Sequence, residues 1–490
     1  MKTIANTPLA ATVVTPNFDR SQLKSRIVHL GFGAFHRAHQ ALYTSEMLAK
    51  TQSDWGICEV NLFGGEELLA SLKQQDYLFT VAEKGSDASL LKIVGAVTEA
   101  LHPKLDGIDT ILAKMAEPQV SIVSLTITEK GYCADPASGQ LDINNSLIQH
   151  DLQHPNAPQS AIGYLVTALK MRRDAGLQPF TVMSCDNVQE NGHVAKAAVL
   201  GFAKALDPQL AEWINDHVTF PCTMVDRIVP AATDEMFAQI NEQLGVVDPC
   251  AIACEPFRQW VIEDKFVNGR PNWDVVDGAQ FVDDVIPFEQ MKLRMLNGSH
   301  SLLAYLGYLS GYEHIADTMT NPDLRQAALN MMLLEQAPTL NMPEGTDIAA
   351  YAQQLIARFT NPALKHQTWQ IAMDGSQKLP QRMIDSVKFH LAQGTHYRHL
   401  TLGIAGWMRY VSGQDEQGNS IDVRDPMLAQ FKAIYQEHGL NVSVVKPLLA
   451  IDAIFGHEIS QNPSFVHAVE TAYQQLLDLG AKATVHALAR

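Results

Sequence analysis

The apolar and polar runs in the first half of the chain predict repeated strand and helix units. Residues 26–30 form a short apolar run, which is followed by a glycine-containing turn and by apolar positions at helical spacing between 38 and 49. The same order recurs, with a buried strand at 55–62 and a helix at 66–72. Further strands are predicted at 77–82, 91–97, 120–128 and 180–185, and a further helix at 161–172. This pattern is typical of an α/β domain built on a parallel sheet.

From about residue 287 onward, the apolar positions recur at helical spacing almost throughout. Helices are predicted at 288–308, 322–336, 347–359, 379–392, 399–411, 426–435 and 463–479. No low-complexity linker or internal repeat separates the two halves of the sequence. We therefore expect a mostly α/β domain with insertions over residues 1–284 and a mostly α-helical domain over residues 285–490.

The length and the charge of the chain support this division and limit the classes of partner. A single hydrophobic core rarely extends beyond about 250–300 residues, so 490 residues with 46% hydrophobic and 18% charged positions indicate at least two folded domains. The 36 basic and 53 acidic residues give a net charge of −17, which repels nucleic acid and anionic membrane surfaces. A small-molecule partner is expected, and an anionic one requires a local basic pocket.

The cysteines and the apolar runs bear on metal content and on location. The 6 cysteines lie far apart, and Cys250 and Cys254 form the closest pair, without a second ligand pair beside them. We expect reduced thiols, no zinc and a cytoplasmic location. No stretch reaches about 18 apolar residues, and Pro16 interrupts a weak apolar run near the start, so neither a membrane span nor a targeting segment is expected.

A glycine turn joins the first predicted strand to the first predicted helix. Gly31 and Gly33 fit the first two positions of a dinucleotide-binding turn, where they allow a tight bend and a close approach of the backbone to a pyrophosphate. The third glycine position of that pattern is occupied by His36. Because any α/β protein can use such a turn for structure alone, the motif leaves both interpretations open.

Polar residues follow two of the predicted strands, at the ends where open parallel sheets bind ligands. An acid after the second strand can accept hydrogen bonds from an adenosine ribose and repel a 2′-phosphate. The candidates are Glu59, Glu66 and Glu67. The sequence does not select one of them, and a solvated carboxylate at a helix start is the alternative. Asn187, after the strand at 180–185, is a further site candidate whose alternative is an Asx turn or a helix cap.

One polar helix face in the second half carries residues with the chemistry of proton transfer. At about 100° of rotation per residue, a face roughly 140° wide contains Glu289, Lys292, Asn297 and His300. A lysine, an amide and an imidazole can together move a proton and stabilise an alkoxide. The polar side of an ordinary amphipathic helix has the same spacing. Other parts of the sequence must therefore decide between a catalytic face and a solvated one.

Six blocks of sequence supply that context. They are G-F-G-A-F-H-R-A-H at 31–39, S-L-T-I-T-E-K-G-Y at 124–132, S-C-D-N at 184–187, C-E-P-F-R-Q-W-V-I-E-D at 254–264, K-L-R-M-L-N-G-S-H at 292–300 and M-D-G-S-Q-K-L-P-Q-R at 373–382. Over nearly its whole length the chain resembles the mannitol dehydrogenase family of long-chain polyol dehydrogenases, for which Lys-x4-Asn-x2-His is highly specific. The resemblance implies an α/β N-terminal Rossmann-type domain that binds NAD, a mostly α-helical C-terminal domain, and metal-independent oxidation of a secondary alcohol in a cleft between them.

The resemblance also implies roles for single residues. The cofactor contacts implied by G-x-G-x-F-x-R are Gly31, Phe32, Gly33, Ala34, Phe35 and Arg37. Lys292 is the general acid/base and His300 orients the substrate, while the oxyanion donors are Asn187 and Asn297. Glu289 and Glu129 are candidates to relay the proton outward. Because a free lysine is protonated at neutral pH, burial beside the positive nicotinamide ring must lower the pKa of Lys292 toward roughly 7–8.

The expected substrate is a sugar acid, whose carboxylate favours a bidentate arginine or a lysine. The basic candidates are Lys378, Arg382 and Arg398, and the alternative for each is a solvated helix charge. Asp226 is a further candidate, with a plain ion pair to Arg227 as its alternative. We expect NAD-dependent interconversion of D-mannonate and D-fructuronate in hexuronate catabolism. The alternatives are the same chemistry on a hexitol or on another aldonate such as altronate, or a dinucleotide-binding protein without catalysis.

Overall fold

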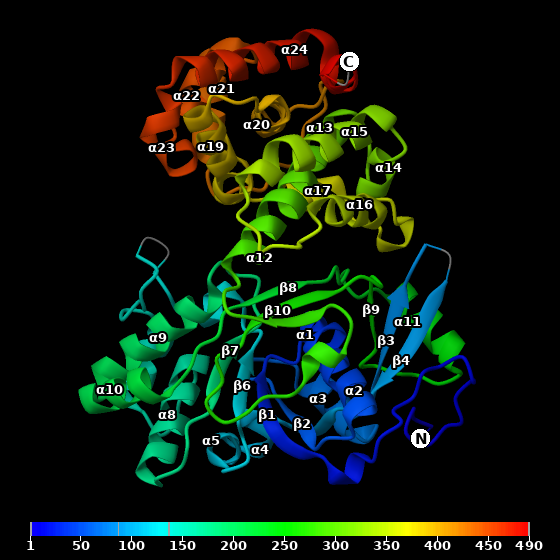
Figure 1. Ribbon diagram of the computed structural model, residues 1–490, viewed down its shortest axis with the longest axis vertical. Helices are drawn as coiled ribbons and strands as arrows, with labels where there is room; N and C mark the ends of the chain where they lie inside the picture. Colours follow the sequence, from blue (N-terminus) through cyan, green and yellow to red (C-terminus); the bar gives the residue numbers. More distant parts are fainter. Residues whose placement is uncertain (1, 87, 136–137, 489–490) are drawn as a thin grey trace. The chain divides into compact units, whose positions relative to one another are not determined.

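The computed structural model describes residues 2–86, 88–135 and 138–488 (Figure 1). The chain forms two compact units, an N-terminal unit (Met1–Ile286) and a C-terminal unit (Pro287–Arg490). Strands and helices alternate in the first unit, whereas the described elements of the second are helices. The predicted fold class, an α/β domain followed by a mostly α-helical one, is confirmed.

A five-stranded parallel sheet organises the N-terminal unit. Its strands are β1 (Lys24–Leu30), β2 (Trp55–Val60), β5 (Val97–Leu101), β6 (Ile122–Leu125) and β7 (Thr181–Ser184). The strand order is β5-β2-β1-β6-β7, and every neighbouring pair runs parallel. After β1, the strands β2 and β5 are added on one side of β1, and β6 and β7 are then added on the other side. The order therefore reverses between β1 and β6, the point at which open sheets of this kind bind ligands.

Helices cover both faces of this sheet, as a parallel sheet requires. They include α2 (Gln40–Thr51), α3 (Glu66–Gln74), α5 (Ile108–Ala116), α8 (Ala161–Asp174) and α9 (Asn191–Leu206). Val28 and Leu30 of β1 belong to one buried apolar cluster with α5, α8 and α9, whereas Ile27 belongs to a second cluster with α2 and α3. In Figure 1, α8 and α9 accordingly lie on one side of the sheet and α2 and α3 on the other. Because alternate residues point to opposite faces and both faces are covered, residues of either face are buried, as in β2, β6 and β7, where every residue is buried.

Two smaller sheets, of order β4-β3-β9 and β11-β10-β8, complete the strands of this unit. Their bounds are β3 (Phe79–Lys84), β4 (Ser89–Val94), β8 (Thr223–Asp226), β9 (Ile252–Cys254), β10 (Gln259–Glu263) and β11 (Ala279–Val282). The single strand predicted at 91–97 was wrong, because the chain leaves β4 at Gly95 and enters β5 of the main sheet. A Cβ at Gly95 would lie 2.6 Å from Pro16 Cγ, so the turn packs tightly on the N-terminal segment.

The remaining helices of the N-terminal unit are short or lie at its periphery. They are α1 (Ala34–Ala38), α4 (Pro103–Asp106), α6 (Thr128–Gly131), α7 (Ser146–Gln153), α10 (Pro208–His217) and α11 (Asp234–Leu244). All six cysteines lie in the described ranges, where they are buried free thiols. Burial raises the pKa of Cys185, Cys250 and Cys254, so these three thiols are protonated at neutral pH.

Two buried helices, α13 (Ser299–Leu309) and α20 (Arg398–Val411), form the centre of the C-terminal unit. They pack so closely that a Cβ at Gly406 would lie 2.9 Å from Leu306 Cδ2. The surrounding helices are α12 (Ile286–Met291), α14 (Ile315–Thr318), α15 (Pro322–Asn330), α16 (Ile348–Phe359), α17 (Thr368–Ala372), α18 (Gly375–Leu379), α19 (Asp385–Gln393), α21 (Leu428–His438), α22 (Val445–Leu449), α23 (Asp452–Ser460) and α24 (Pro463–Leu488). Within the described ranges, none of the helices combines the length and apolar character needed to cross a bilayer.

Three helices of the C-terminal unit contain π-helical segments. These are η3 (Lys292–Gly298), η4 (Met331–Gln336) and η7 (Pro380–Ile384). Continuous α-helices were predicted over all three, and in this respect the predictions were wrong. A π-helix forms i→i+5 hydrogen bonds, so the residues that share its face differ from those of an α-helix. Segments of this kind occur frequently at functional sites.

Candidate functional site

The turn between β1 and α1 requires glycine at its first position. Gly31 has a φ of +113°, and a Cβ there would lie 2.2 Å from the carbonyl oxygen of Thr126, the residue after β6. The Gly31 carbonyl also accepts a hydrogen bond from Thr126 Oγ1 at 2.8 Å. Gly33 differs, since its φ is −88° and a Cβ there would have only Gly31 O nearby, at 3.8 Å. Gly31 therefore joins β1 to β6, whereas Gly33 leaves open space beside the turn.

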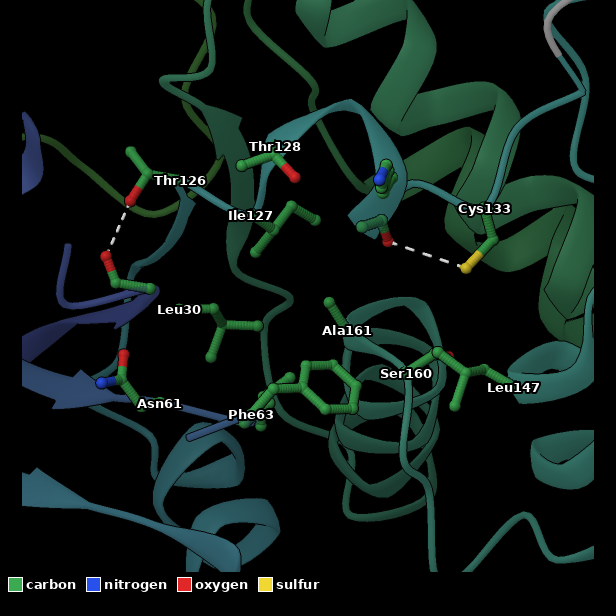
Figure 2. Close-up of a pocket in the computed structure, with 14 residues that line it drawn as sticks. Leu30, Asn61, Phe63, Thr126, Ile127, Thr128, Cys133, Leu147, Ser160 and Ala161 are labelled. Atoms are coloured by element: carbon green, nitrogen blue, oxygen red, sulfur yellow. Dashed lines mark hydrogen bonds between the residues drawn. The ribbon is translucent and has the colours of Figure 1, made fainter. Parts of the chain in front are cut away.

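A cavity of about 450 Å³ opens at the carboxyl ends of β1, β2 and β6 (Figure 2). Its lining combines apolar side chains, such as Leu30, Phe63 and Ile127, with the polar side chains of Asn61 and Thr126. The position coincides with the reversal of strand order. The size, the apolar walls and the few polar groups fit a cofactor site at the switch point of an α/β sheet. The space beside Gly33 fits a pyrophosphate that approaches the backbone closely.

The other residues of the glycine motif have different structural tasks. Ala34 and Phe35 open the five-residue helix α1, where the first amides have no partner within the helix. The Phe32 amide donates to Asn61 Oδ1 at 2.7 Å. Arg37 is buried, and its guanidinium donates to Gly33 O at 3.2 Å and to Cys250 O at 2.6 Å. Arg37 was predicted to contact the cofactor, but in this structure it holds the turn against the segment before β9.

The three candidate ribose acids lie in different environments. Glu59 is 0% exposed, and its Oε1 lies 2.7 Å from His36 Nε2, so its predicted role at a ribose conflicts with its burial. Glu66 and Glu67 lie in the first turn of α3, after the cavity residue Phe63, where Glu66 pairs with Lys104 Nζ at 2.7 Å and Glu67 is exposed. Sequence reasoning missed Asn61, although as the polar residue directly after β2 it satisfies the criterion applied to the acids.

A buried polar cluster lies beneath the glycine turn. The ligand-type atoms of His29, His36 and Glu59 lie within 4.8 Å of one another, and the two imidazole rings stack at 3.4 Å. His29 is already engaged, since its Nδ1 lies 2.8 Å from Ser124 Oγ and its Nε2 lies 2.8 Å from Thr126 Oγ1. No local sequence pattern indicates this cluster, because its members come from three elements, β1, α1 and β2. With both nitrogens of His29 engaged and no exposed surface, the cluster supports the turn.

The loop after β6 and the end of β7 are tied together by Asp186. Its buried carboxylate accepts hydrogen bonds from Ile127 N at 3.1 Å, from Thr128 N at 2.8 Å and from Tyr132 Oη at 2.6 Å. Burial raises the pKa of Asp186, and these hydrogen bonds oppose that shift. Sequence reasoning selected the next residue, Asn187, which is exposed at the carboxyl end of β7. The cap position of α9 is Glu190, so Asn187 does not cap that helix.

Two further predicted site residues, Glu129 and Asp226, lie in the N-terminal unit. Glu129 is exposed on the short helix α6, whose start at Thr128 is held by Asp186. Asp226 is buried at the end of β8. The adjacent Arg227 donates to Glu83 Oε1 at 2.5 Å and to the carbonyls of Ala38 and Glu255 at 2.6 and 2.7 Å. The guanidinium of Arg227 is thus engaged with Glu83 and with two backbone carbonyls.

Lys292 and Asn297 lie in the π-helical segment η3. Lys292 is 7% exposed at its first position, and Asn297 follows five residues later. Because a π-helix pairs residues i and i+5, these two residues are neighbours one turn apart. The α-helical rotation assumed from the sequence would separate them by about 140°. Glu289 lies half-buried on α12, immediately before this segment.

His300 lies at the start of α13 and is 8% exposed. Its ring stacks on Phe359 at 4.6 Å and meets the ring of His366 edge-on at 5.1 Å. Burial lowers the pKa of His300 well below its ordinary value, and the positive charges of Arg382 and Lys378 add to this effect. His300 is therefore a neutral imidazole near pH 7, which can donate or accept one hydrogen bond at each nitrogen.

Two of the predicted basic residues belong to the surroundings of His300. Arg382 Nη1 donates to Ser301 Oγ at 3.1 Å and to Asn297 O at 3.4 Å, and Lys378 Nζ donates to Met373 O at 2.5 Å. Burial lowers the pKa of Arg382 to about 10 and that of Lys378 to about 8, with Arg382 adding to the shift of the lysine. Arg382 Nε is buried without a hydrogen-bond partner among the described residues. This arrangement fits an anionic group.

Arg398 lies elsewhere in the C-terminal unit. It is exposed at the start of α20 and lines two other cavities, together with Thr395 and His396. The described residues that line these cavities include neither Lys378 nor Arg382. Arg398 was named as a third basic candidate for the substrate carboxylate, and the structure places it beside other cavities than the surroundings of His300.

Comparison with known proteins covers both units. The family model of the mannitol dehydrogenase Rossmann domain matches residues 25–275, and that of the mannitol dehydrogenase C-terminal domain matches residues 284–477. D-mannonate oxidoreductase of Escherichia coli (strain K12) is 66% identical over 490 residues, which is 100% of each chain. The Pseudomonas fluorescens mannitol 2-dehydrogenase, solved as a ternary complex with NAD and D-mannitol, is 39% identical with a TM-score of 0.83, covering 98% of this chain and 97% of its own. A D-sorbitol dehydrogenase solved in substrate-free form is 34% identical with a TM-score of 0.91, covering 97% and 98%.

Proposed function

The chain belongs to the mannitol dehydrogenase family, and from that premise we propose that it interconverts D-mannonate and D-fructuronate as a step of hexuronate catabolism. It is an NAD-dependent oxidoreductase that acts on a CH–OH group. The observation that carries the substrate assignment is the 66% identity to D-mannonate oxidoreductase over the entire chain, against 39% to the mannitol 2-dehydrogenase. In this proposal the N-terminal unit binds the dinucleotide and the C-terminal unit binds the sugar acid.

The C-terminal unit supplies the acid/base chemistry in this proposal. Lys292 takes the hydroxyl proton at Nζ in the oxidation direction and returns it in the reduction direction. NAD, held by the N-terminal unit, would supply the acceptor for the hydride that leaves the carbon atom. The amide group of Asn297 donates a hydrogen bond to the developing alkoxide without adding a further charge to the site, and the same role for Asn187 stays a prediction. His300, as a neutral imidazole, orients the substrate by hydrogen bonds.

The proton then has to leave the site. Glu289 lies on α12 about one turn before Lys292, and Glu129 is exposed on α6, the short helix that follows β6. We assign Glu289 to a relay that carries the proton to solvent, and the same role for Glu129 stays a prediction. In the N-terminal unit, the space beside Gly33 and the first amides of α1 accommodate the pyrophosphate, and Glu66 or Glu67 accepts hydrogen bonds from the ribose.

The charges around His300 favour a sugar acid over a polyol. Arg382 and Lys378 contribute two cations there, and a hexitol offers no negative group to compensate them. The buried and unpartnered Arg382 Nε supports the same substrate, because a carboxylate can accept its hydrogen bond. Asp226, buried at the end of β8, is assigned to a substrate hydroxyl. Arg398 has no part in this proposal.

The oxidation of NADH, followed with D-fructuronate, D-fructose and D-tagaturonate in parallel, tests the proposal. The expected result is a kcat/KM for D-fructuronate at least about 100-fold above that for D-fructose, since the neutral ketose leaves buried charges unpaired. A preference for D-fructose would support the alternative in which the enzyme acts on a hexitol. A preference for D-tagaturonate would support the alternative in which it acts on altronate. Binding of NADH without turnover of any of the three compounds would support the alternative that the protein binds a dinucleotide but is not a catalyst.

A further inference from the structure

The three π-helical segments of the C-terminal unit meet at Gln336, the last residue of η4. Its side chain is 0% exposed and makes hydrogen bonds at both ends of the amide. Nε2 donates to Arg382 O in η7 at 2.9 Å, and Oε1 accepts from Ser386 Oγ at 2.6 Å. A carbonyl oxygen can only accept, so the amide atom that faces Arg382 must be the nitrogen. The orientation of the Gln336 side chain is thereby determined.

The hydrogen bond from Gln336 to Arg382 lies directly against the segment that carries Lys292 and Asn297. A Cβ at Gly298, the last residue of η3, would lie 2.8 Å from Arg382 O and 2.9 Å from Gln336 Nε2. No other residue type fits there unless that hydrogen bond lengthens. The backbone of η3 is thus in contact with the donor and the acceptor of the bond.

Arg382 is held at two points. Its backbone carbonyl is fixed by Gln336, and its guanidinium donates to Asn297 O at 3.4 Å and to Ser301 Oγ at 3.1 Å. The hydrogen bond from Gln336 positions the main chain of η7 relative to η3. The contacts of the guanidinium depend on that position, because the side chain of Arg382 can reach Asn297 and Ser301 only if its own backbone stays in place.

The residue before Gln336 fixes the position of η4 itself. The Glu335 carboxylate accepts from His399 N and His399 Nδ1 through Oε1, at 2.9 and 2.7 Å, and from Leu400 N through Oε2 at 2.8 Å. These are the first amides of the buried helix α20, which a carboxylate stabilises. Because Glu335 is held in this way, the adjacent Gln336 cannot move toward Arg382 to compensate for a shift of η7.

We propose that Gln336 is a positioning residue that places the Arg382 guanidinium relative to Asn297 and His300, and that it thereby contributes to the selection of an anionic substrate. The second part rests on the proposed function, which assigns the carboxylate of the substrate to Arg382. Gln336 lies behind Arg382 and acts only through it. Loss of its amide leaves the buried Arg382 carbonyl without that donor, and η7 then relaxes to recover a partner.

A double-mutant cycle between Gln336→Met and Arg382→Met, measured as kcat and KM for D-fructuronate and D-fructose, tests this inference. Methionine retains the approximate volume of glutamine and removes both hydrogen bonds. Gln336→Met is expected to raise the KM for D-fructuronate about tenfold, with kcat changed less than about twofold, and to alter the KM for D-fructose little. In the Arg382→Met background, the same substitution is expected to add less than about a twofold effect.

A merely structural role would give a different result. Equal losses on both ketoses, or effects that add fully in the Arg382→Met background, would overturn the positioning role. The substrate preference of the wild-type enzyme tests the proposed function separately. If D-fructose is preferred, the proposed function fails. The double-mutant cycle is then measured with D-fructose. Full additivity of the two substitutions would still refute the coupling of Gln336 to Arg382.

Two further variants make the experiment specific. Tyr435→Phe removes another partly buried hydrogen bond from a side chain to a carbonyl in the same unit, from Tyr435 Oη to Met408 O at 2.6 Å, and it is expected to leave both KM values unchanged. Ser386→Ala removes only the hydroxyl that donates to Gln336 Oε1. It is expected to shift the KM for D-fructuronate in the same direction by a smaller factor, and it replaces Gln336→Met if that variant does not fold. A KM change in Tyr435→Phe as large as that in the Gln336 variant would also overturn the inference.

Discussion

Glu59 Oε1 lies 2.7 Å from His36 Nε2, and both side chains are 0% exposed. Burial raises the pKa of Glu59 to about 8 and lowers the pKa of His36 to about 3. Both shifts favour the uncharged forms near pH 7, so the pair shares one proton beneath the glycine turn. Since charging either member in this core is unfavourable, the pair couples the stability of the turn to pH.

The free energy of unfolding is expected to depend on pH through Glu59. Between the ordinary glutamate pKa of 4.5 and about 8, the folded state retains a proton that the unfolded state releases, so the contribution of Glu59 falls as pH rises. The contribution of His36 rises with pH between about 3 and 6.5 and is constant above that range. From pH 6.5 to 8, only Glu59 of this pair changes the stability.

Glu59→Gln tests this dependence, because glutamine retains a donor toward His36 and does not titrate. The stability of the variant relative to the wild type is expected to increase by about 1–2 kcal/mol between pH 6.5 and 8. Urea unfolding of both proteins at several pH values in this range measures the difference. Two curves that stay parallel across the range would show that Glu59 is ionised in the folded protein.

Replacement of Lys292 by Ala is expected to reduce turnover by about 10²–10⁴-fold, the usual contribution of a positioned acid/base. The Kd for NADH should stay close to that of the wild type, because the cavity at the glycine turn lies in the other unit. Steady-state kinetics and fluorescence titration with NADH measure the two quantities. Near-normal turnover in Lys292→Ala would remove this residue from the chemical step.

The two glycines of the turn provide a matched pair of substitutions. Gly31→Ala places a Cβ 2.2 Å from Thr126 O at a φ of +113°, so it should lower the thermal midpoint and abolish cofactor binding. Gly33→Ala meets only Gly31 O, at 3.8 Å, so the fold should be retained while the methyl group occupies the space proposed for the pyrophosphate. For Gly33→Ala we expect an unchanged thermal midpoint and a Kd for NADH raised about tenfold or more. Unchanged NADH binding in Gly33→Ala would place the pyrophosphate elsewhere.

Cofactor preference tests the acidic residues after β2. We expect strong discrimination in favour of NAD over NADP, because a carboxylate near the ribose repels the 2′-phosphate. Glu66→Gln or Glu67→Gln should improve kcat/KM with NADP, whereas Glu59→Gln should leave the preference unchanged, since Glu59 is buried against His36. Equal efficiency of the wild-type enzyme with NAD and NADP would contradict a ribose carboxylate at any of the three positions.

Activity is expected to survive exhaustive treatment with a strong chelator, because the proposed mechanism assigns to Lys292 the role that zinc has in other alcohol dehydrogenases. Elemental analysis of the active protein should find no stoichiometric transition metal, including at the cluster of His29, His36 and Glu59. Loss of activity on chelation, restored by added zinc or manganese, would overturn the lysine mechanism.

The main sheet was predictable because its signal is local. Strands buried on both faces are rich in apolar residues, and Leu30 at the end of β1 is followed directly by Gly31, which indicates a tight turn. The partners of polar side chains were not predictable in this way. His36 meets Glu59 across 23 residues, and Arg37 reaches the carbonyl of Cys250 across 213 residues. Hydrophobic periodicity states which face of an element is buried but not which distant polar group lies opposite.

The candidate site in the C-terminal unit was predicted in its residue types and not in its geometry. Lys292 and His300 were selected by spacing along an assumed α-helix, whereas the segment between them is π-helical. Arg382 donates a hydrogen bond to Ser301, next to His300, whereas Arg398 lines two other cavities, although both are arginines near the start of a predicted helix. The polar residues after β7 are visible in the sequence, but only the structure shows that Asp186 supports the neighbouring segment at 127–132 while Asn187 is exposed.

The number of residues between Lys292 and His300 is as constrained as their identities. A π-helical turn contains more residues than an α-helical turn. The side chains of α13, which follows it, therefore point in directions rotated from those of a continuous α-helix, and this rotation is called the phase below. That phase decides which side chains of α13 meet α20 and on which side His300 emerges. Deletion of one residue between them would restore an α-helical phase and rotate the side chains of α13 by about 100°. A chain with every motif residue present and one residue fewer between them would lose their alignment, so in this stretch a change of length is more damaging than most changes of side chain.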